Sequence, residues 1–232
     1  AIRRDFVANV SHELRTPLTS IRGFVEALED GAVAEPQTAQ RFLGKIRTHA
    51  DRMAALVEDL LELGRLESGA RAPEPEQTRS AEVVEDVVAS FAGAATRKDI
   101  GLRCHDRGAP GVLTDPERLR RILENLVDNA VKYTPTGGKV EVTTSAGPDG
   151  SARIEVADNG PGIAAEHLAR IFERFYRVDR ARSRELGGTG LGLSIVKHLA
   201  EGMGASVSVE SEPGKGAKFI VSLPAALPGK PA

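Results

Sequence analysis

Several residue types are scarce or absent in this chain of 232 residues. It has one cysteine, no tryptophan and only 4% aromatic residues. A single cysteine excludes a disulfide framework within the chain and favours a reducing, cytosolic setting. With so few aromatic side chains, we expect a core built from leucine, valine, isoleucine and alanine.

An excess of one charge and long apolar runs are also missing. The 31 basic and 33 acidic residues give a formal net charge of −2, so no global basic field suggests a nucleic-acid partner. No apolar run approaches the roughly 20 residues of a membrane-spanning helix, and no signal peptide is visible. We therefore expect neither nucleic-acid binding nor membrane contact from these residues.

Two helices are predicted at the start of the chain. Apolar residues recur every three or four positions over residues 2–28 and again over about 37–66. Gly31 and Pro36 mark the turn between them, and proline is well suited to the first position of a helix. The second helix carries a sustained heptad that a lone hairpin cannot bury. We therefore expect two hairpins to pair as an antiparallel four-helix bundle in a homodimer.

A second domain is predicted after a polar stretch, residues 68–79, which is typical of a linker. Ser80 and Asp115 are expected to cap helices, and the alternating patterns that follow predict mostly antiparallel strands. Helices and strands segregated in this way predict a two-layer α/β sandwich over residues 80–224, with 225–232 as a frayed tail. The expected helices are 80–98, 116–133 and 190–203, and the expected strands are 100–105, 111–114, 138–146, 151–158, 205–211 and 216–223.

A reactive histidine is predicted in the first helix. His12 and Glu13 lie side by side in the helical pattern, and Pro17 follows five residues after the histidine. A histidine that acts as a nucleophile gains from an adjacent acid, because the acid can hold the ring in one tautomer and accept the displaced proton. This pair therefore favours a catalytic histidine over a structural one.

Two asparagines suggest a cation beside a phosphate. Asn125 and Asn129 are four residues apart, so they share one face of their helix, and Lys132 and Tyr133 follow close to that face. Neutral amide oxygens suit Mg²⁺ next to a nucleotide. The alternative is two amides on a solvated helix, but the apolar residues between them favour a packed helix that presents both to a cleft.

Two glycine-containing runs follow. The first, DNGPG at 158–162, ends an apolar strand; its carboxylate can accept a hydrogen bond from an amine such as that of adenine, and its glycines let a ligand approach the backbone. The second, GGTGLG at 187–192, leads into a helix whose free N–H groups can cradle phosphate. Position 193 is leucine, so this run is not the dinucleotide fingerprint, and no P-loop motif is present.

Taken in order, these segments resemble a bacterial two-component sensor histidine kinase. The resemblance implies a dimerisation and phosphotransfer hairpin at 1–67 and a GHKL-type ATP-binding domain at 80–224. The chain opens inside an expected helix without methionine, so we expect a cytoplasmic fragment of a protein anchored in the bacterial inner membrane. The similar segments are the H box around His12, the N box at Asn125–Asn129, the G1 box at Asp158–Gly162, the F box at Ile171–Arg177 and the G2 box at Gly188–Gly192.

The resemblance also implies a reaction. His12 would take the γ-phosphoryl group of ATP, and the group would then pass from Nε2 to an aspartate of a response regulator receiver domain. Glu13 is implied as base or tautomer anchor, and Thr16 as the residue that positions water in phosphatase activity toward the regulator. The ATP-binding domain would have to swing onto the bundle, with 68–79 as hinge.

The remaining implied roles concern the nucleotide. Asn125 is expected to hold Mg²⁺, Asn129 to contact a phosphate, and Asp158 to read the adenine. Arg177 is expected to contact a phosphate, whereas Arg174 stays open between a phosphate contact and surface charge. The other residues implied in nucleotide binding are Lys132, Tyr133, Gly160, Gly162, Gly188, Thr189, Gly190, Leu191 and Gly192.

Two other interpretations stay open. Another ATPase of the GHKL fold, such as a chaperone, a mismatch-repair protein or a protein-serine kinase, would share the nucleotide boxes but lack an H box on a dimeric hairpin. A non-catalytic dimeric interaction module would keep the fold, yet every expected polar position is occupied here. His49, on the heptad seam, is expected to be a packed or rim residue and not a second phosphoacceptor. Residues 178–187 are expected to form a mobile, charged lid over the nucleotide.

Overall fold

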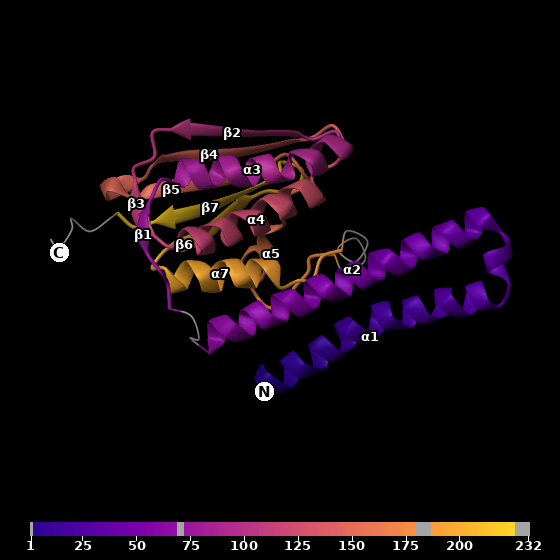
Figure 1. Cartoon of the computed structure of the whole chain (residues 1–232). Helices are drawn as coiled ribbons and strands as arrows, with labels where there is room; N and C mark the ends of the chain where they lie inside the picture. The colour runs from indigo at the N-terminus through magenta and orange to yellow at the C-terminus, as the bar shows by residue number, and fades with distance from the viewer. Residues whose placement is uncertain (1, 69–71, 180–186, 226–232) are drawn as a thin grey trace.

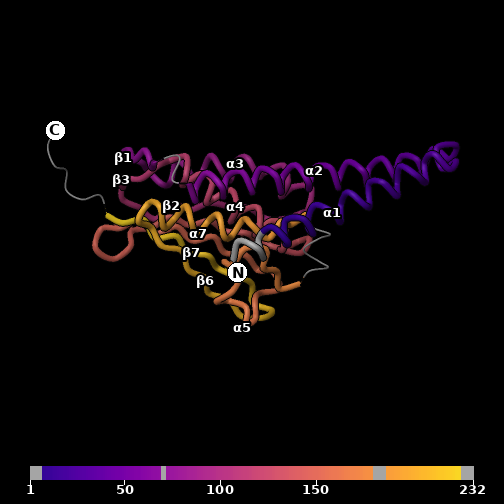
Figure 2. Tube along the Cα trace, turned by 90° about the horizontal axis from the view of Figure 1, so that it is seen from below, coloured from indigo at the N-terminus to yellow at the C-terminus, as the bar shows by residue number. Residues whose placement is uncertain are grey.

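A helical hairpin opens the computed structural model, which describes residues 2–68, 72–179 and 187–225. Helices α1 (Ile2–Glu29) and α2 (Pro36–Glu67) are joined by the short 3-10 turn η1 (Ala32–Ala34). Gly31 takes a left-handed φ of 117° there, a conformation that costs glycine little. The hairpin runs along the α/β domain, and its turn projects beyond that domain (Figures 1 and 2). The predicted hairpin is therefore confirmed.

A five-stranded sheet and its helices form the α/β domain. The strands lie in the order β2-β4-β5-β7-β6; β2 and β4 are parallel, and the other neighbours are antiparallel. Helices α3, α4 and α7 cover one face of this sheet (Figure 1), so the predicted two-layer sandwich is confirmed. The bounds are α3 (Ser80–Arg97), β2 (Gly101–Arg107), α4 (Pro116–Tyr133), β4 (Lys139–Ala146), η2 (Pro148–Gly150), β5 (Ala152–Asp158), α5 (Ala165–Leu168), α7 (Gly192–Gly202), β6 (Ser206–Ser211) and β7 (Ala217–Leu223).

The core between sheet and helices is aliphatic, as the composition predicts. Leu126 of α4 and Ile154 of β5 are fully buried, and Phe219 is the one buried aromatic residue in the described ranges. Apolar residues alternate with polar ones along β4 and β5, which turns one face of each strand to the helices. This packing holds α4 rigidly against the sheet.

Helix α4 begins as predicted. Asp115 is its N-cap and accepts a hydrogen bond of 3.0 Å from the backbone N–H of Arg118, and Pro116 takes the first helical position. The side chain of Asp115 also accepts from the backbone N–H of Glu74 at 3.0 Å. The cap therefore fixes both the start of α4 and the chain that arrives from the hairpin.

Two details at the domain boundary differ from expectation. The end of segment 68–79 is not free linker, because β1 (Glu76–Thr78) pairs antiparallel with β3 (Val112–Thr114). Ser80 is not a cap: it is the first residue of α3, its hydroxyl is buried, and it has no hydrogen-bond partner in the described part of the chain. Arg79 takes the cap position because the chain arrives extended from β1.

The hairpin leaves part of its apolar surface uncovered. Leu56 and Leu63 of α2 are buried within the main core cluster. His49 is half-buried, stacks on Phe24 with ring centroids 6.2 Å apart, and has its pKa lowered by burial and by nearby Arg52, as expected for a packed residue. Other apolar side chains stay 38–62% exposed: Val7, Leu18, Val25, Leu43, Val57 and Leu61.

Across the described ranges, no helix combines the length and the apolar character that a bilayer span requires.

Candidate functional site

A cavity of about 580 Å³ lies between α4, the end of β5, the loops before α7 and the middle of α2. Ile163, Ile171 and Phe219 give it an apolar wall, and the amides of α4 give it a polar one. Its volume lies in the range of pockets that bind small molecules and cofactors.

Most of the residues predicted to bind a nucleotide meet in this cavity. Gly160 and Leu191 do not line it and act as supports instead. The backbone N–H of Gly160 donates to Asp158 Oδ1 at 2.8 Å, and the backbone N–H of fully buried Leu191 donates to Thr189 Oγ1 at 3.2 Å. The lining residues are Asn125, Asn129, Lys132, Tyr133, Asp158, Gly162, Arg177, Gly188, Thr189, Gly190 and Gly192.

Asp158 lies at the end of β5 beside the apolar wall. Burial raises the pKa of this carboxyl, while backbone hydrogen bonds from Gly160 and Ala217 oppose the rise. A carboxylate has about four lone-pair sites, so two backbone bonds leave it able to accept from a ligand amine. An apolar wall with one such acceptor fits a purine ring that carries an exocyclic amine.

The glycines of the 158–162 run lie in crowded parts of the fold. Gly162 has a left-handed φ of 70°, and a Cβ there would lie 2.0 Å from the carbonyl oxygen of Glu212. A Cβ on Gly160 would lie 2.7 Å from Asp158 Oδ1. A side chain at either position would therefore meet its neighbours too closely, and the expectation that these glycines also admit a ligand stays a prediction.

Asn125 presents an oxygen where α4 meets the start of α7. Its Nδ2 donates to the carbonyl oxygen of Arg121 at 2.8 Å, which leaves Oδ1 as the acceptor. A Cβ on Gly192 would lie 2.6 Å from this oxygen, so glycine is needed there. Within the described ranges no cluster of three His, Cys, Asp or Glu residues could hold a metal. One amide oxygen fits Mg²⁺ that takes its other ligands from phosphates and water.

Arg177 lines the cavity but is held by protein partners. Its Nη2 donates to the carbonyl oxygen of Thr189 at 2.7 Å and to Glu13 Oε2 at 2.9 Å, and its side chain is only 4% exposed. Arg174 does not line the cavity; it forms an ion pair with Glu67 of α2. Both arginines predicted as possible phosphate contacts therefore bind the hairpin in this arrangement.

The H box lies beside the cavity without lining it. His12 is exposed on α1, and the Thr16 hydroxyl donates to the carbonyl oxygen of His12 at 3.2 Å. Glu13 Oε2 accepts from Arg52 Nη2 at 3.1 Å as well as from Arg177. The carboxylate next to the histidine is thus occupied by two cations.

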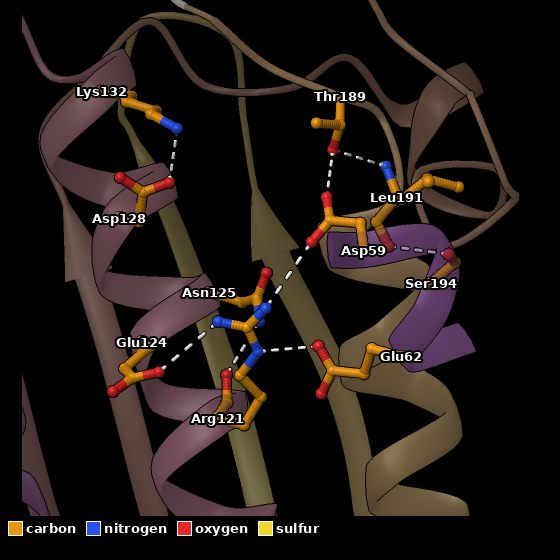
Figure 3. Close-up of polar contacts among 10 residues, drawn as sticks. All are labelled: Asp59, Glu62, Arg121, Glu124, Asn125, Asp128, Lys132, Thr189, Leu191 and Ser194. Carbon is orange, nitrogen blue, oxygen red and sulfur yellow. Dashed lines mark hydrogen bonds and ion pairs between the residues drawn. The ribbon is translucent and has the colours of Figure 1, made fainter. Parts of the chain in front are cut away.

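No pattern in the sequence marks the acidic residues that α2 brings to and beside the cavity. Asp59 Oδ2 accepts a 2.7 Å hydrogen bond from Thr189 Oγ1, and its Oδ1 lies 3.7 Å from Arg121 Nη2 (Figure 3). Burial raises the pKa of Asp59, opposed by that hydrogen bond and by Arg121. Glu62 of α2 accepts from Arg121 Nε at 2.8 Å. Most of the expected lid, residues 180–186, lies outside the described residues.

Two family models match this chain. The His Kinase A (phospho-acceptor) domain matches residues 2–69, and the histidine kinase-, DNA gyrase B- and HSP90-like ATPase matches residues 114–227. The first contains the H box, and the second contains the described cavity residues of α4, β5 and α7.

The curated relatives include a sensor-like histidine kinase and a sensor protein. The sensor-like histidine kinase SenX3 of Mycolicibacterium smegmatis is 41% identical over 224 residues, which are 97% of this chain and 58% of SenX3. The sensor protein SrrB of Staphylococcus aureus is 38% identical over 229 residues, 96% of this chain and 38% of SrrB. The chain therefore spans about half the length of these relatives or less.

Solved structures match this chain along nearly its whole length. Full-length ShkA in complex with AMPPNP matches with a TM-score of 0.70 and 33% identity, over 98% of this chain and 47% of that one. Histidine kinase ThkA in complex with response regulator protein TrrA matches with a TM-score of 0.79 and 26% identity, over 96% and 61%. The chain belongs to the two-component sensor histidine kinases and carries their phospho-acceptor and ATP-binding domains.

Proposed function

We propose that this chain transfers the γ-phosphoryl group of ATP to His12 and then to an aspartate of a response regulator receiver domain. One observation carries the proposal: Arg177 lines the cavity and binds Glu13, the neighbour of His12. The phosphoacceptor helix and the nucleotide cavity are thus linked by one side chain. The relatives named above support the same activity.

The proposed step is an in-line displacement. A ring nitrogen of His12 forms a P–N bond to the γ-phosphorus while the bond to the bridging oxygen breaks and ADP leaves. Glu13 would hold the imidazole tautomer and accept its proton. Asp158 would hold the adenine amine, and Asn125 and Asn129 the phosphate end. When bound by Asn125, Mg²⁺ supplies charge neutralisation on the phosphates.

Glu13 is engaged by Arg52 and Arg177, so its proposed role beside His12 requires these contacts to open, and we take the structure as a resting arrangement. Reaction would require the ATP-binding domain to move on the hairpin, with the chain between α2 and β1 as hinge. We retain 1–67 and 80–224 as the two functional units, and add that β1 belongs structurally to the second.

Labelled ATP tests this function. We expect the full chain, incubated with γ-labelled ATP and Mg²⁺, to acquire a label that acid removes and base does not, as a phosphoramidate requires. Chelation of divalent cations should reduce labelling about a hundredfold, because the phosphate charge then lacks its main counter-ion. An acid-stable label would point to another kind of kinase, and hydrolysis without any label to a plain ATPase.

Phosphatase activity is proposed on Thr16. Its hydroxyl lies one helical turn after His12, next to the phosphoacceptor. Thr16→Ala should slow dephosphorylation of a phosphorylated receiver domain about tenfold or more, because a water loses its orienting hydroxyl. Autophosphorylation should stay within about threefold of wild type. Thr16→Ser, which keeps the hydroxyl, is the control, and equal dephosphorylation rates for Ala and Ser would remove Thr16 from the mechanism.

A homodimer through the hairpin is proposed from its uncovered apolar side chains, among them Leu18, Leu43 and Leu61, each about half exposed in a single chain. A second copy would bury them in a four-helix bundle. Sedimentation equilibrium should then give two chains per particle, and a single chain per particle would contradict the proposal.

We further propose that the whole protein works at the cytoplasmic face of the bacterial inner membrane.

A further inference from the structure

Thr189, in the glycine-rich loop (187–191), is tied to both helices of the hairpin. Its hydroxyl donates to Asp59 Oδ2 of α2 at 2.7 Å. Its carbonyl oxygen accepts from Arg177 Nη2 at 2.7 Å, and the same nitrogen donates to Glu13 Oε2 of α1 at 2.9 Å. One residue of the predicted phosphate-binding loop therefore contacts α2 directly and is connected to α1, the helix of His12, through Arg177.

These contacts are largely withdrawn from water. The side chains of Asp59 and Glu13 are 13% and 17% exposed, and that of Arg177 is 4% exposed. Hydrogen bonds in such surroundings are stronger than at a wet surface. Asp59 stands between Thr189 of the loop and Arg121 of α4, which Glu62 and Glu124 also engage (Figure 3). The hairpin thus contributes a largely buried carboxylate, that of Asp59, to the loop.

The same place is where phosphates would bind. The loop opens α7, and N–H groups at a helix start attract anions. Asp59 lines this cavity as a carboxylate, so an entering triphosphate meets a like charge. The Thr189 hydroxyl that a phosphate oxygen could use is already donated to Asp59. In the resting arrangement, Asp59 of α2 therefore accepts the hydrogen bond from Thr189 that a phosphate of the nucleotide would otherwise accept.

We propose that Asp59 is a gating residue that competes with the nucleotide phosphates for the glycine-rich loop, so that hairpin docking and nucleotide binding oppose each other. The inference rests on the nucleotide binding proposed above. A phosphate that displaces Asp59 shifts the Thr189 backbone, which is also a partner of Arg177, and so loosens the grip of Arg177 on Glu13. Because coupling is reciprocal, nucleotide entry weakens docking by the factor by which docking weakens nucleotide affinity.

Calorimetry with a non-hydrolysable ATP analogue and Mg²⁺ tests the proposal on the full chain. Asp59→Asn should bind the analogue about fivefold tighter or more, a gain that damage to the fold would not produce. The matched control is Glu58→Gln, an exposed neighbour that lines the same cavity and removes the same charge. Its effect should stay within about twofold, because an exposed charge is screened.

A double-mutant cycle separates the contact from charge alone. In a Thr189→Ala background, Asp59→Asn should give a clearly smaller gain than in wild type, because the contact is already gone and only the like charge remains to be removed. A full gain in that background, or an equal gain from Glu58→Gln, would overturn the proposal. If wild type binds the analogue and Asp59→Asn binds it no tighter, the gating role is wrong and the proposed function stands. If wild type does not bind the analogue, the proposed function is wrong, and the gating role falls with it.

Discussion

Replacing His12 by glutamine should abolish autophosphorylation, with a loss of about a thousandfold or more, as expected when the nucleophile of a covalent step is removed. Glutamine keeps a polar side chain of similar reach but has no nucleophilic nitrogen. His12 is exposed on α1, so the substitution should leave the fold intact. The measurement is the acid-labile label from γ-labelled ATP, with analogue binding as a second readout that should stay unchanged.

His49→Gln is the matched control for this experiment. His49 is the other histidine of the hairpin, half-buried and stacked on Phe24. Its loss should cost packing but leave labelling within about threefold of wild type. Label that persists in His12→Gln, or disappears in His49→Gln while His12 remains, would place the phosphoacceptor elsewhere.

Asp158→Asn should weaken ATP binding by about 10- to 100-fold, the range for losing a hydrogen bond to a charged, buried acceptor. An asparagine amide would turn an N–H group, or a weaker carbonyl acceptor, toward the adenine amine. Inosine triphosphate, which lacks this amine, gives the sharper measurement. Wild type should prefer ATP to inosine triphosphate, and Asp158→Asn should lose most of that preference.

The pH dependence of binding tests the same carboxyl. Burial raises the pKa of Asp158 above its ordinary value, so the charge is lost at a higher pH than for a free carboxyl. Wild-type affinity for ATP should therefore fall as the pH drops through this raised pKa, while Asp158→Asn should lack that step. Asp149→Asn, in the turn before β5, is the control, since asparagine tolerates its left-handed φ of 58°. An unchanged preference for ATP in Asp158→Asn would remove Asp158 from adenine recognition.

Local rules in the sequence determined the elements. The helical spacing over 2–28, the Asp115-Pro116 start of α4 and the glycine turn at Gly31 each act within a few residues, so a single sequence contains the whole cause. The segments expected to bind the nucleotide could be recognised for the same reason. The amide pair of α4, the carboxylate after β5 and the glycine-rich loop were predicted as parts of one site, and the fold brings them to one cavity.

Only the tertiary structure decided how the hairpin meets that cavity. Glu13 and Arg177 are 164 residues apart in sequence, and Asp59 and Thr189 are 130 apart, yet each pair is in hydrogen-bond contact. No periodicity marks Asp59, because its charge fits an ordinary solvated helix face. The pairing of β1 with β3, after which Arg79 and not Ser80 takes the N-cap position of α3, is equally non-local. The hairpin contacts depend on docking one domain on another, and the free energy of docking is a sum over distant residues that no short stretch of sequence contains.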